Sequence, residues 1–125
     1  MWLVSNQKGS AVTDFVLVAF PMLAIFSMTV SITLGSYARV VLLDATIEGA
    51  RYAALADQTI AEGISRTKKI VADTLGSAVV VNVDAVLEKS GTIETIRFAS
   101  TMSFTNGFVI PLLSASSVAT REIEY

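Results

Sequence analysis

Histidine and cysteine are both missing from this 125-residue chain, and charged residues make up only 16% of it. Without these two residue types there is no Ser-His or Cys-His nucleophile pair, and the usual zinc ligands are absent. A disulfide framework is excluded as well. The 9 basic and 11 acidic residues give a net charge of −2, and they form no basic stripe for phosphate contacts. We therefore expect no binding to nucleic acid.

Other routes to catalysis have little support. Lys68, Lys69 and Lys89 are available for a serine–lysine pair, but no serine lies in a strained-turn signature. Asp44 and Glu48, one helical turn apart, have the spacing to hold a hard cation, although a solvated helix face is the commoner explanation. No glycine-rich phosphate loop occurs. We expect no catalytic residue, no metal site and no cofactor, and hence a protein that is not an enzyme.

The dominant feature that is present is an apolar run. From Phe15 to Ala38 the chain reads "FVLVAFPMLAIFSMTVSITLGSYA", without a charged residue. A bilayer hydrocarbon core is about 30 Å thick and needs roughly 20 apolar residues of helix. The run is therefore long enough to span a membrane, and it explains much of the 53% hydrophobic content.

Three interpretations of this run compete. A buried helix of a soluble protein would need more surrounding chain than the remaining residues supply. A cleaved secretory signal has an apolar region of only about 7–15 residues, although "SYA" before Arg39 resembles a signal-peptidase site. We favour the membrane span. Lys8 precedes the run. Arg39 follows it, but Asp44 nearby compensates the charge of Arg39. The positive-inside rule therefore narrowly favours a cytoplasmic N-terminus.

Two features modify the expected span. Pro21 has no amide hydrogen to donate and is expected to kink the helix. Four small hydroxylated residues alternate further on, and they can bond back to carbonyls of their own helix or across to a neighbouring helix. They are Ser27, Thr29, Ser31 and Thr33.

Helical periodicity continues beyond the span. One apolar stripe comprises Val40, Leu43, Ile47, Ala50 and Ala54. A charged stripe comprises Asp44, Glu48 and Arg51. A second, short amphipathic helix is predicted to start at Thr59, which forms a capping box with Glu62, and to end at Gly76. Glu62 and Arg66 have the spacing of a favourable helical ion pair. The apolar face of this second helix comprises Ile60, Ile64, Thr67, Val71 and Leu75.

After Gly76 the periodicity changes to two residues. Strands are predicted at 78–86, 96–104 and 116–125, with a turn at 89–91 and a loop with an apolar tip at Asn106–Leu113. The expected fold class is therefore α+β: a long N-terminal transmembrane helix, a short amphipathic helix, and a small antiparallel sheet of about three strands.

The segments "GSAVTDFVLVAFPMLAIFSM" and "GARYAA" resemble the TadE-like minor pilins of tight-adherence (Flp) pilus systems, within the type IV pilin-like class. In that class a short basic leader ends in glycine, a prepilin peptidase cuts after it, and the mature chain has an acid in fifth place, usually followed by phenylalanine. The resemblance implies that Gly9 precedes the cut, that Ser10 becomes the N-terminus, and that Asp14 and Phe15 are the fifth and sixth residues. Aspartate replaces the usual glutamate, and the leader holds a single lysine.

This resemblance is specific for residues 8–56 and weak for 92–124. It implies a prepilin-type leader at 1–9, a transmembrane helix at 10–38 and an extracytoplasmic pilin-like head at 39–125. The implied function is that of a minor pilin or pseudopilin in assembly of a Tad/Flp-type pilus. The implied partners are other pilin subunits, the prepilin peptidase and the membrane assembly platform. The implied location is the cytoplasmic membrane in a single pass, and the pilus at the cell surface after assembly.

The alternative function is a bitopic membrane protein whose external domain binds a ligand or protein, without processing and without a pilus. The acid at position 14 likewise has two explanations. In the first, cleavage after Gly9 frees an amine on Ser10 that pairs with Asp14, on the same chain or a neighbour. In the second, Ser10 caps the helix and Asp14 favours the positive end of the helix dipole.

Overall fold

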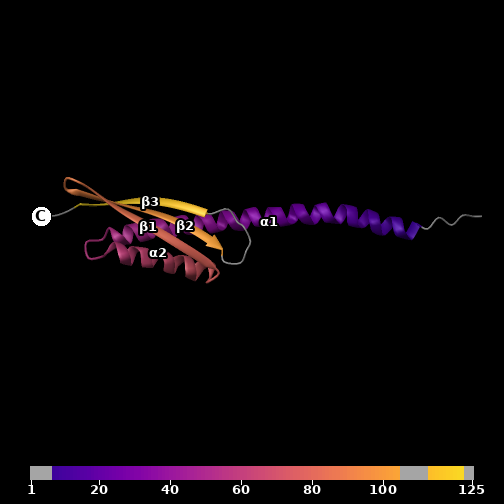
Figure 1. The fold of residues 1–125 in the computed structure, drawn as a ribbon, viewed down its shortest axis with the longest axis horizontal. Coiled ribbons are helices and arrows are strands. Elements are labelled where there is room, and N and C mark those ends of the chain that lie inside the picture. Colours follow the sequence, from indigo (N-terminus) through magenta and orange to yellow (C-terminus); the bar gives the residue numbers. More distant parts are fainter. Residues whose placement is uncertain (1–6, 105–112, 123–125) are drawn as a thin grey trace, which may run out of the picture. The chain divides into compact units, whose positions relative to one another are not determined.

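The computed structural model describes residues 7–104 and 113–122, and it has the expected α+β fold (Figure 1). Two helices come first, followed by three strands. They are α1 (Gln7–Ala53), α2 (Ile60–Leu75), β1 (Val79–Ser90), β2 (Ile93–Phe104) and β3 (Leu113–Glu122). The chain divides into two compact units, Met1–Leu34 and Gly35–Tyr125, and α1 contributes to both.

The described residues of the N-terminal unit, 7–34, are the first part of α1. Its large apolar side chains are exposed along the whole segment, with Phe15 at 72% and Phe20 at 73%. The stretch from Ser10 to Ala53 contains a window of mean hydropathy 2.3, none of it buried. By length and composition this helix can span a membrane, which agrees with the interpretation of the apolar run.

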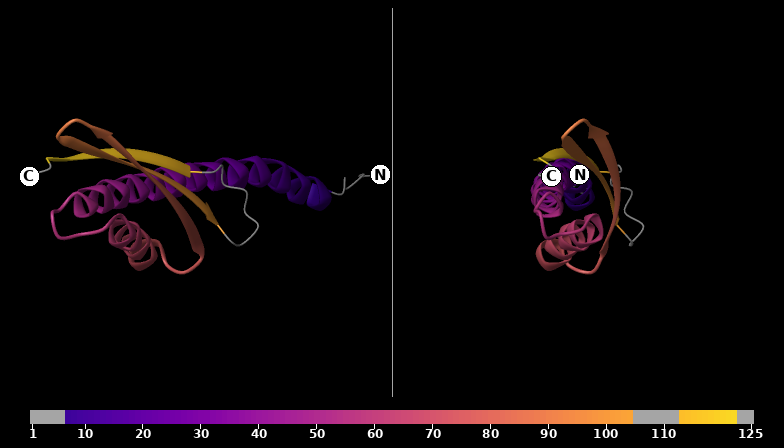
Figure 2. Two further views of the ribbon diagram at one scale, coloured as in Figure 1. Left: turned by 60° about the vertical axis from the view of Figure 1, so that its left-hand side comes forward. Right: turned by 90° about the vertical axis from the view of Figure 1, so that its left-hand side faces the viewer.

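The C-terminal unit is a sheet packed on helices. Its strands are antiparallel in the order β1-β2-β3, with Ser90 opposite Ile93 at the tight turn and Met102 opposite Leu113 in the second pair. Both helices lie on the same face of this sheet, as the two views of Figure 2 show, and α2 packs against β1. The loop predicted at Asn106–Leu113 lies outside the described residues, except that Leu113 begins β3.

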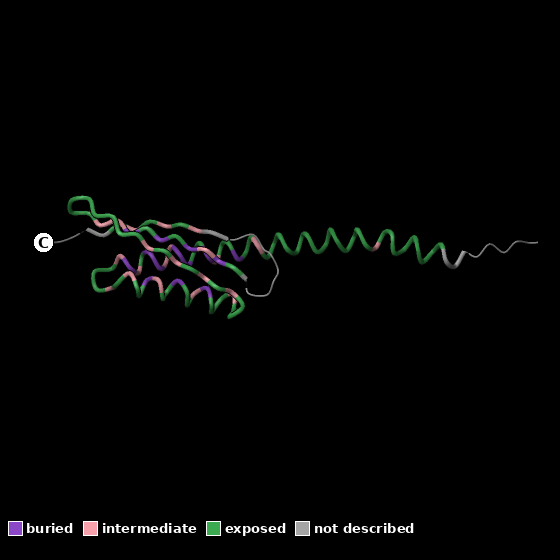
Figure 3. The backbone as a smooth tube through the Cα atoms, in the orientation of Figure 1, coloured by how far each residue is buried: buried purple, intermediate pink, exposed green. Residues whose placement is uncertain are grey.

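The core lies between the helices and β2. One buried cluster comprises Ala38, Leu42, Ala45, Val71 and Met102. The other comprises Ala50, Ala53, Ile96 and Phe98. Alternate residues of β2 therefore point inward, as the two-residue period of "IRFASTMSF" predicts. In Figure 3 the buried positions are confined to the region where helices and sheet meet.

The apolar stripe along α1 is not the face of the helix that forms the core. Val40 is 64% exposed and Leu43 42%, and of the five predicted stripe residues only Ala50 is fully buried. The sheet and α2 cover the neighbouring face, which carries small residues, because a small side chain lets a second backbone come close. The larger stripe is left facing outward.

The boundaries of α2 follow its local signals. Thr59 is the N-cap, its hydroxyl accepts from the amide of Glu62, and the Glu62 carboxylate accepts from the amide of Thr59 at 2.7 Å, so the capping box is confirmed. Gly76 ends the helix with φ +84°. The predicted Glu62–Arg66 pair is replaced by a longer-range one: Arg66 contacts Glu48 of α1 at 3.3 Å and stacks on Tyr52.

Candidate functional site at the start of the apolar helix

The predicted processing site lies inside α1. The helix begins at Gln7, so the peptide bond between Gly9 and Ser10 belongs to its first turn. Backbone amides in the first turn have no helical acceptor, and helix ends of this kind fray readily. Ser10 is exposed. The bond is therefore in the part of the helix that opens at least cost.

The capping explanation of Ser10 and Asp14 does not hold for the intact chain. Ser10 is inside the helix and cannot be its N-cap, since α1 already begins at Gln7. The first turn holds no acidic residue, and Asp14 lies about two turns from the helix start. Because the effect of the helix dipole falls off within the first turn, it gives Asp14 little stabilisation.

The surroundings of Asp14 are apolar. Its carboxylate is exposed, and it is the only charged residue between Gly9 and Arg39. An exposed apolar patch lies on the same stretch of the helix, formed by Val12, Val16, Leu17 and Phe20 together with Thr13, and Asp14 is not among its lining residues. Phe15, the other residue of the predicted pair, is exposed beside it. A carboxylate on this otherwise uncharged stretch is left without local charge compensation whenever lipid or another helix covers it.

Further along, the span is continuously helical. α1 runs through Pro21 without interruption. The hydroxyls of Thr29, Ser31 and Thr33 donate to the carbonyl oxygens four residues earlier, at 2.8–2.9 Å. Of the two uses considered for these residues, bonding back to the same helix is the one observed, and it removes the cost of a free hydroxyl in lipid.

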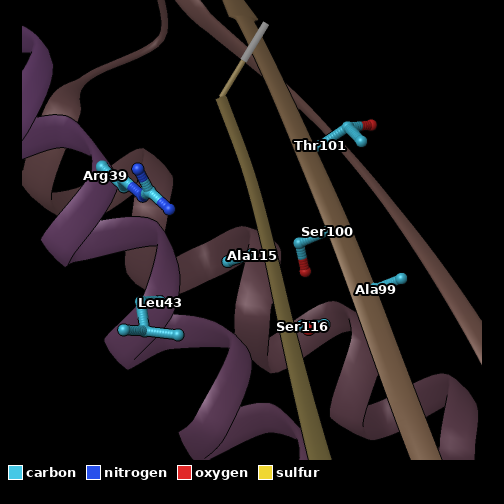
Figure 4. Close-up of a pocket in the computed structure, with 7 residues that line it drawn as sticks. All are labelled: Arg39, Leu43, Ala99, Ser100, Thr101, Ala115 and Ser116. Carbon is cyan, nitrogen blue, oxygen red and sulfur yellow. The ribbon is translucent and has the colours of Figure 1, made fainter.

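A second feature, in the C-terminal unit, was not predicted from the sequence. An open groove of about 420 Å³ lies between α1 and the sheet (Figure 4). Arg39 and Leu43 form its α1 side, and small residues of β2 and β3 form the other: Ala99, Ser100, Thr101, Ala115 and Ser116. Arg39 is visible in the sequence as the first charge after the apolar run, but the strands that face it are far away in the chain.

No candidate metal site occurs in the part of the chain that the structure describes. Its acidic residues form no group of three or more that lies close enough to hold an ion. Asp44 and Glu48 remain a pair on the α1 surface, and Glu48 is engaged by Arg66.

Geometry and sequence thus single out the start of α1, where Asp14 is the only charged residue between Gly9 and Arg39. Comparisons with models of known protein families, with curated proteins and with solved structures found no match for this chain.

Proposed function

We propose that this chain is a TadE-like minor pilin or pseudopilin that contributes structurally to assembly of a Tad/Flp-type pilus. It is inserted in the cytoplasmic membrane by α1, with the C-terminal unit outside the cytoplasm. A prepilin peptidase removes residues 1–9, and the mature chain then packs with other pilin subunits at the membrane assembly platform.

The observation that carries this proposal is the difference in burial between the two parts of α1. The buried core of the C-terminal unit comes from residues 38–102, and of the apolar run it includes only the last residue, Ala38. The run from Phe15 to Leu34 is left exposed, apart from a half-covered Ala19. A helix of this kind needs lipid or other helices as its environment, and a pilin moves from the first to the second.

The position of Asp14 gives the assembly step a physical basis. Cleavage after Gly9 leaves an α-amine on Ser10, and four residues of helix separate the two groups by about 6 Å along the axis. The new helix would begin near Ser10, so that Asp14 also moves toward the positive end of the helix dipole. Pairing of the carboxylate with the amine of a neighbouring subunit would favour one register of packing over others.

A second candidate function is an unprocessed bitopic anchor carrying an external binding domain. It is favoured by the helical conformation already present at Gln7, before the predicted cut. In that case residues 7–9 are simply the first turn of the anchor, and the head acts outside without a filament.

The decisive experiment is to determine the N-terminus of the chain extracted from membranes of its native host. A chain that begins at Ser10 supports the pilin, and one that begins at Met1 supports the simple anchor. A chain that begins near Arg39 overturns both, since it has lost the span. The variant Gly9→Leu should retain residues 1–9, whereas Ala19→Leu, an equivalent enlargement further along α1, should be processed normally.

A further inference from the structure

The exposed apolar segment of α1 is longer than the hydrocarbon core of a bilayer is thick. From Phe15 to Leu43 the helix is about 42 Å long, against about 30 Å of hydrocarbon. Val40 and Leu43 therefore lie outside the lipid core when Asp14 lies at the opposite interface, and both are substantially exposed. Water is a poor environment for two neighbouring apolar residues on one helix face, and Ile47 next to them is only half-buried.

The spacing of these residues is that of a two-stranded coiled coil. Val40 and Ile47 are seven residues apart and occupy the a position of a heptad, with Leu43 at the intervening d position. β-Branched residues at a combined with leucine at d favour a parallel dimer. The stripe ends after Ile47, because Ala50 at the next d position is buried under the sheet.

Charges flank the stripe in a self-complementary way. In the same heptad Arg39 occupies g and Asp44 occupies e, five residues later. In a parallel, in-register pair each g residue lies opposite the e residue five positions on in the partner, where opposite charges form salt bridges. Arg39 and Asp44 are both exposed, and neither has an ion pair or hydrogen bond among the described residues.

The groove beside Arg39 leaves room for the incoming carboxylate. Its far wall is made of alanines and of hydroxylated residues, of which Ser100 is buried, Thr101 half-buried and Ser116 exposed (Figure 4). A carboxylate entering there meets the guanidinium of Arg39. Small residues on β3 also keep the sheet from colliding with a second helix laid along Leu43.

We propose that two copies of this chain dimerise through Val40, Leu43 and Ile47 of α1, parallel and in register, with Arg39 of each copy paired to Asp44 of the other. Copies inserted by the same N-terminal span are necessarily parallel, which satisfies the orientation that the charges require. The dimer depends on membrane insertion but not on leader removal or on a pilus. A result that refutes the proposed function therefore does not refute the dimer, and a result that refutes the dimer does not refute the proposed function.

Disulfide cross-linking of the full chain in membranes tests the contact directly. The chain has no native cysteine, so single-cysteine variants are unambiguous. Under a mild oxidant, Val40→Cys, Leu43→Cys and Ile47→Cys should each give a covalent dimer, because a disulfide needs Cα atoms within about 7 Å. Val41→Cys, on the other side of the helix, is the matched control and should stay monomeric. Absence of dimer at all three positions, or equal dimer at position 41, overturns the proposal.

Charge reversal tests the register. In the Ile47→Cys background, Arg39→Glu and Asp44→Arg should each lower dimer association on the order of tenfold, since each converts two attractive pairs into repulsive ones. The double variant should restore it. Arg51→Glu is the control: it lies on the same flank, but its opposite g position is Thr46, which is uncharged and buried. Failure of the double variant to recover overturns the Arg39–Asp44 pairing.

Discussion

Gly49 of α1 and Gly63 of α2 meet backbone to backbone where the two helices cross. A Cβ atom placed on Gly63 would lie 2.6 Å from the carbonyl oxygen of Gly49, and one placed on Gly49 would lie 2.8 Å from the carbonyl oxygen of Gly63. It would also collide with the hydroxyl of Thr67. Both contacts are with backbone, which cannot move aside as a flexible side chain can, so the crossing requires glycine on both helices.

The variant Gly63→Ala should destabilise the C-terminal unit. The added methyl would lie 2.6 Å from the Cβ of Ala53 and 3.0 Å from the ring of Phe98, so the helices must separate. Such overpacking costs about 1–3 kcal/mol, against a helix-propensity gain of about 1 kcal/mol. We expect Tm of the detergent-solubilised chain, followed by circular dichroism, to fall by roughly 5–10 °C.

Gly35→Ala is the control for this prediction. Gly35 lies in α1 with nothing within 4 Å of its added Cβ, so only the propensity gain applies and Tm should hold or rise. Equal melting temperatures for the two variants would show that the crossing is looser than the structure has it.

A second prediction concerns a buried pair of hydroxyls. Those of Thr46 and Ser100 are hydrogen-bonded at 2.9 Å, and Thr46 also donates to the carbonyl oxygen of Leu42. Both side chains are fully buried. Thr46→Val leaves the Ser100 hydroxyl without its partner and should cost about 1–3 kcal/mol in the free energy of unfolding. The double variant with Ser100→Ala should recover most of that loss, and strictly additive losses in denaturant unfolding would refute the coupling.

The N-cap of α2 gives a third prediction. Thr59→Ala removes the acceptor for the Glu62 amide and should lower the free energy of unfolding by about 1 kcal/mol. Thr74→Ala makes the same chemical change on the exposed face of the same helix, where the hydroxyl only bonds back to Ile70. It should be neutral or slightly stabilising. Urea unfolding of the two variants side by side would reveal whether the cap contributes at all.

Features that depend on neighbours in the chain could be predicted from the sequence. The capping box needs only Thr59 and Glu62, and the end of α2 needs only Gly76. The inward residues of β2, Ile96 and Phe98 among them, follow from a strict two-residue period. The long apolar helix follows from length and composition alone. Each signal is complete within a few residues, so no tertiary context was needed.

Features that depend on distant contacts could not be predicted. The periodicity of α1 contains two apolar stripes, and only the approach of α2 through Gly63 selects the small-residue one for the core. Arg66 has an ideal partner one turn earlier, yet the helix crossing offers Glu48 and the ring of Tyr52 instead. The groove beside Arg39 depends on strands more than fifty residues away.

The carboxylate of Asp14, the only charged group of the apolar segment between Gly9 and Arg39, gives the last prediction. Asp14→Asn keeps the size of the side chain and removes its charge, so membrane insertion should be unchanged while pairing with the Ser10 amine is lost. A hydrogen bond to a charged group contributes about 1.5–3 kcal/mol, and we therefore expect the amount of chain in sheared surface filaments to fall tenfold or more. Asp14→Glu, which keeps the charge, should assemble normally. Filament recovery from Asp14→Asn equal to that of the parent chain would exclude this pairing, because an uncharged amide cannot replace the carboxylate as the counter-ion.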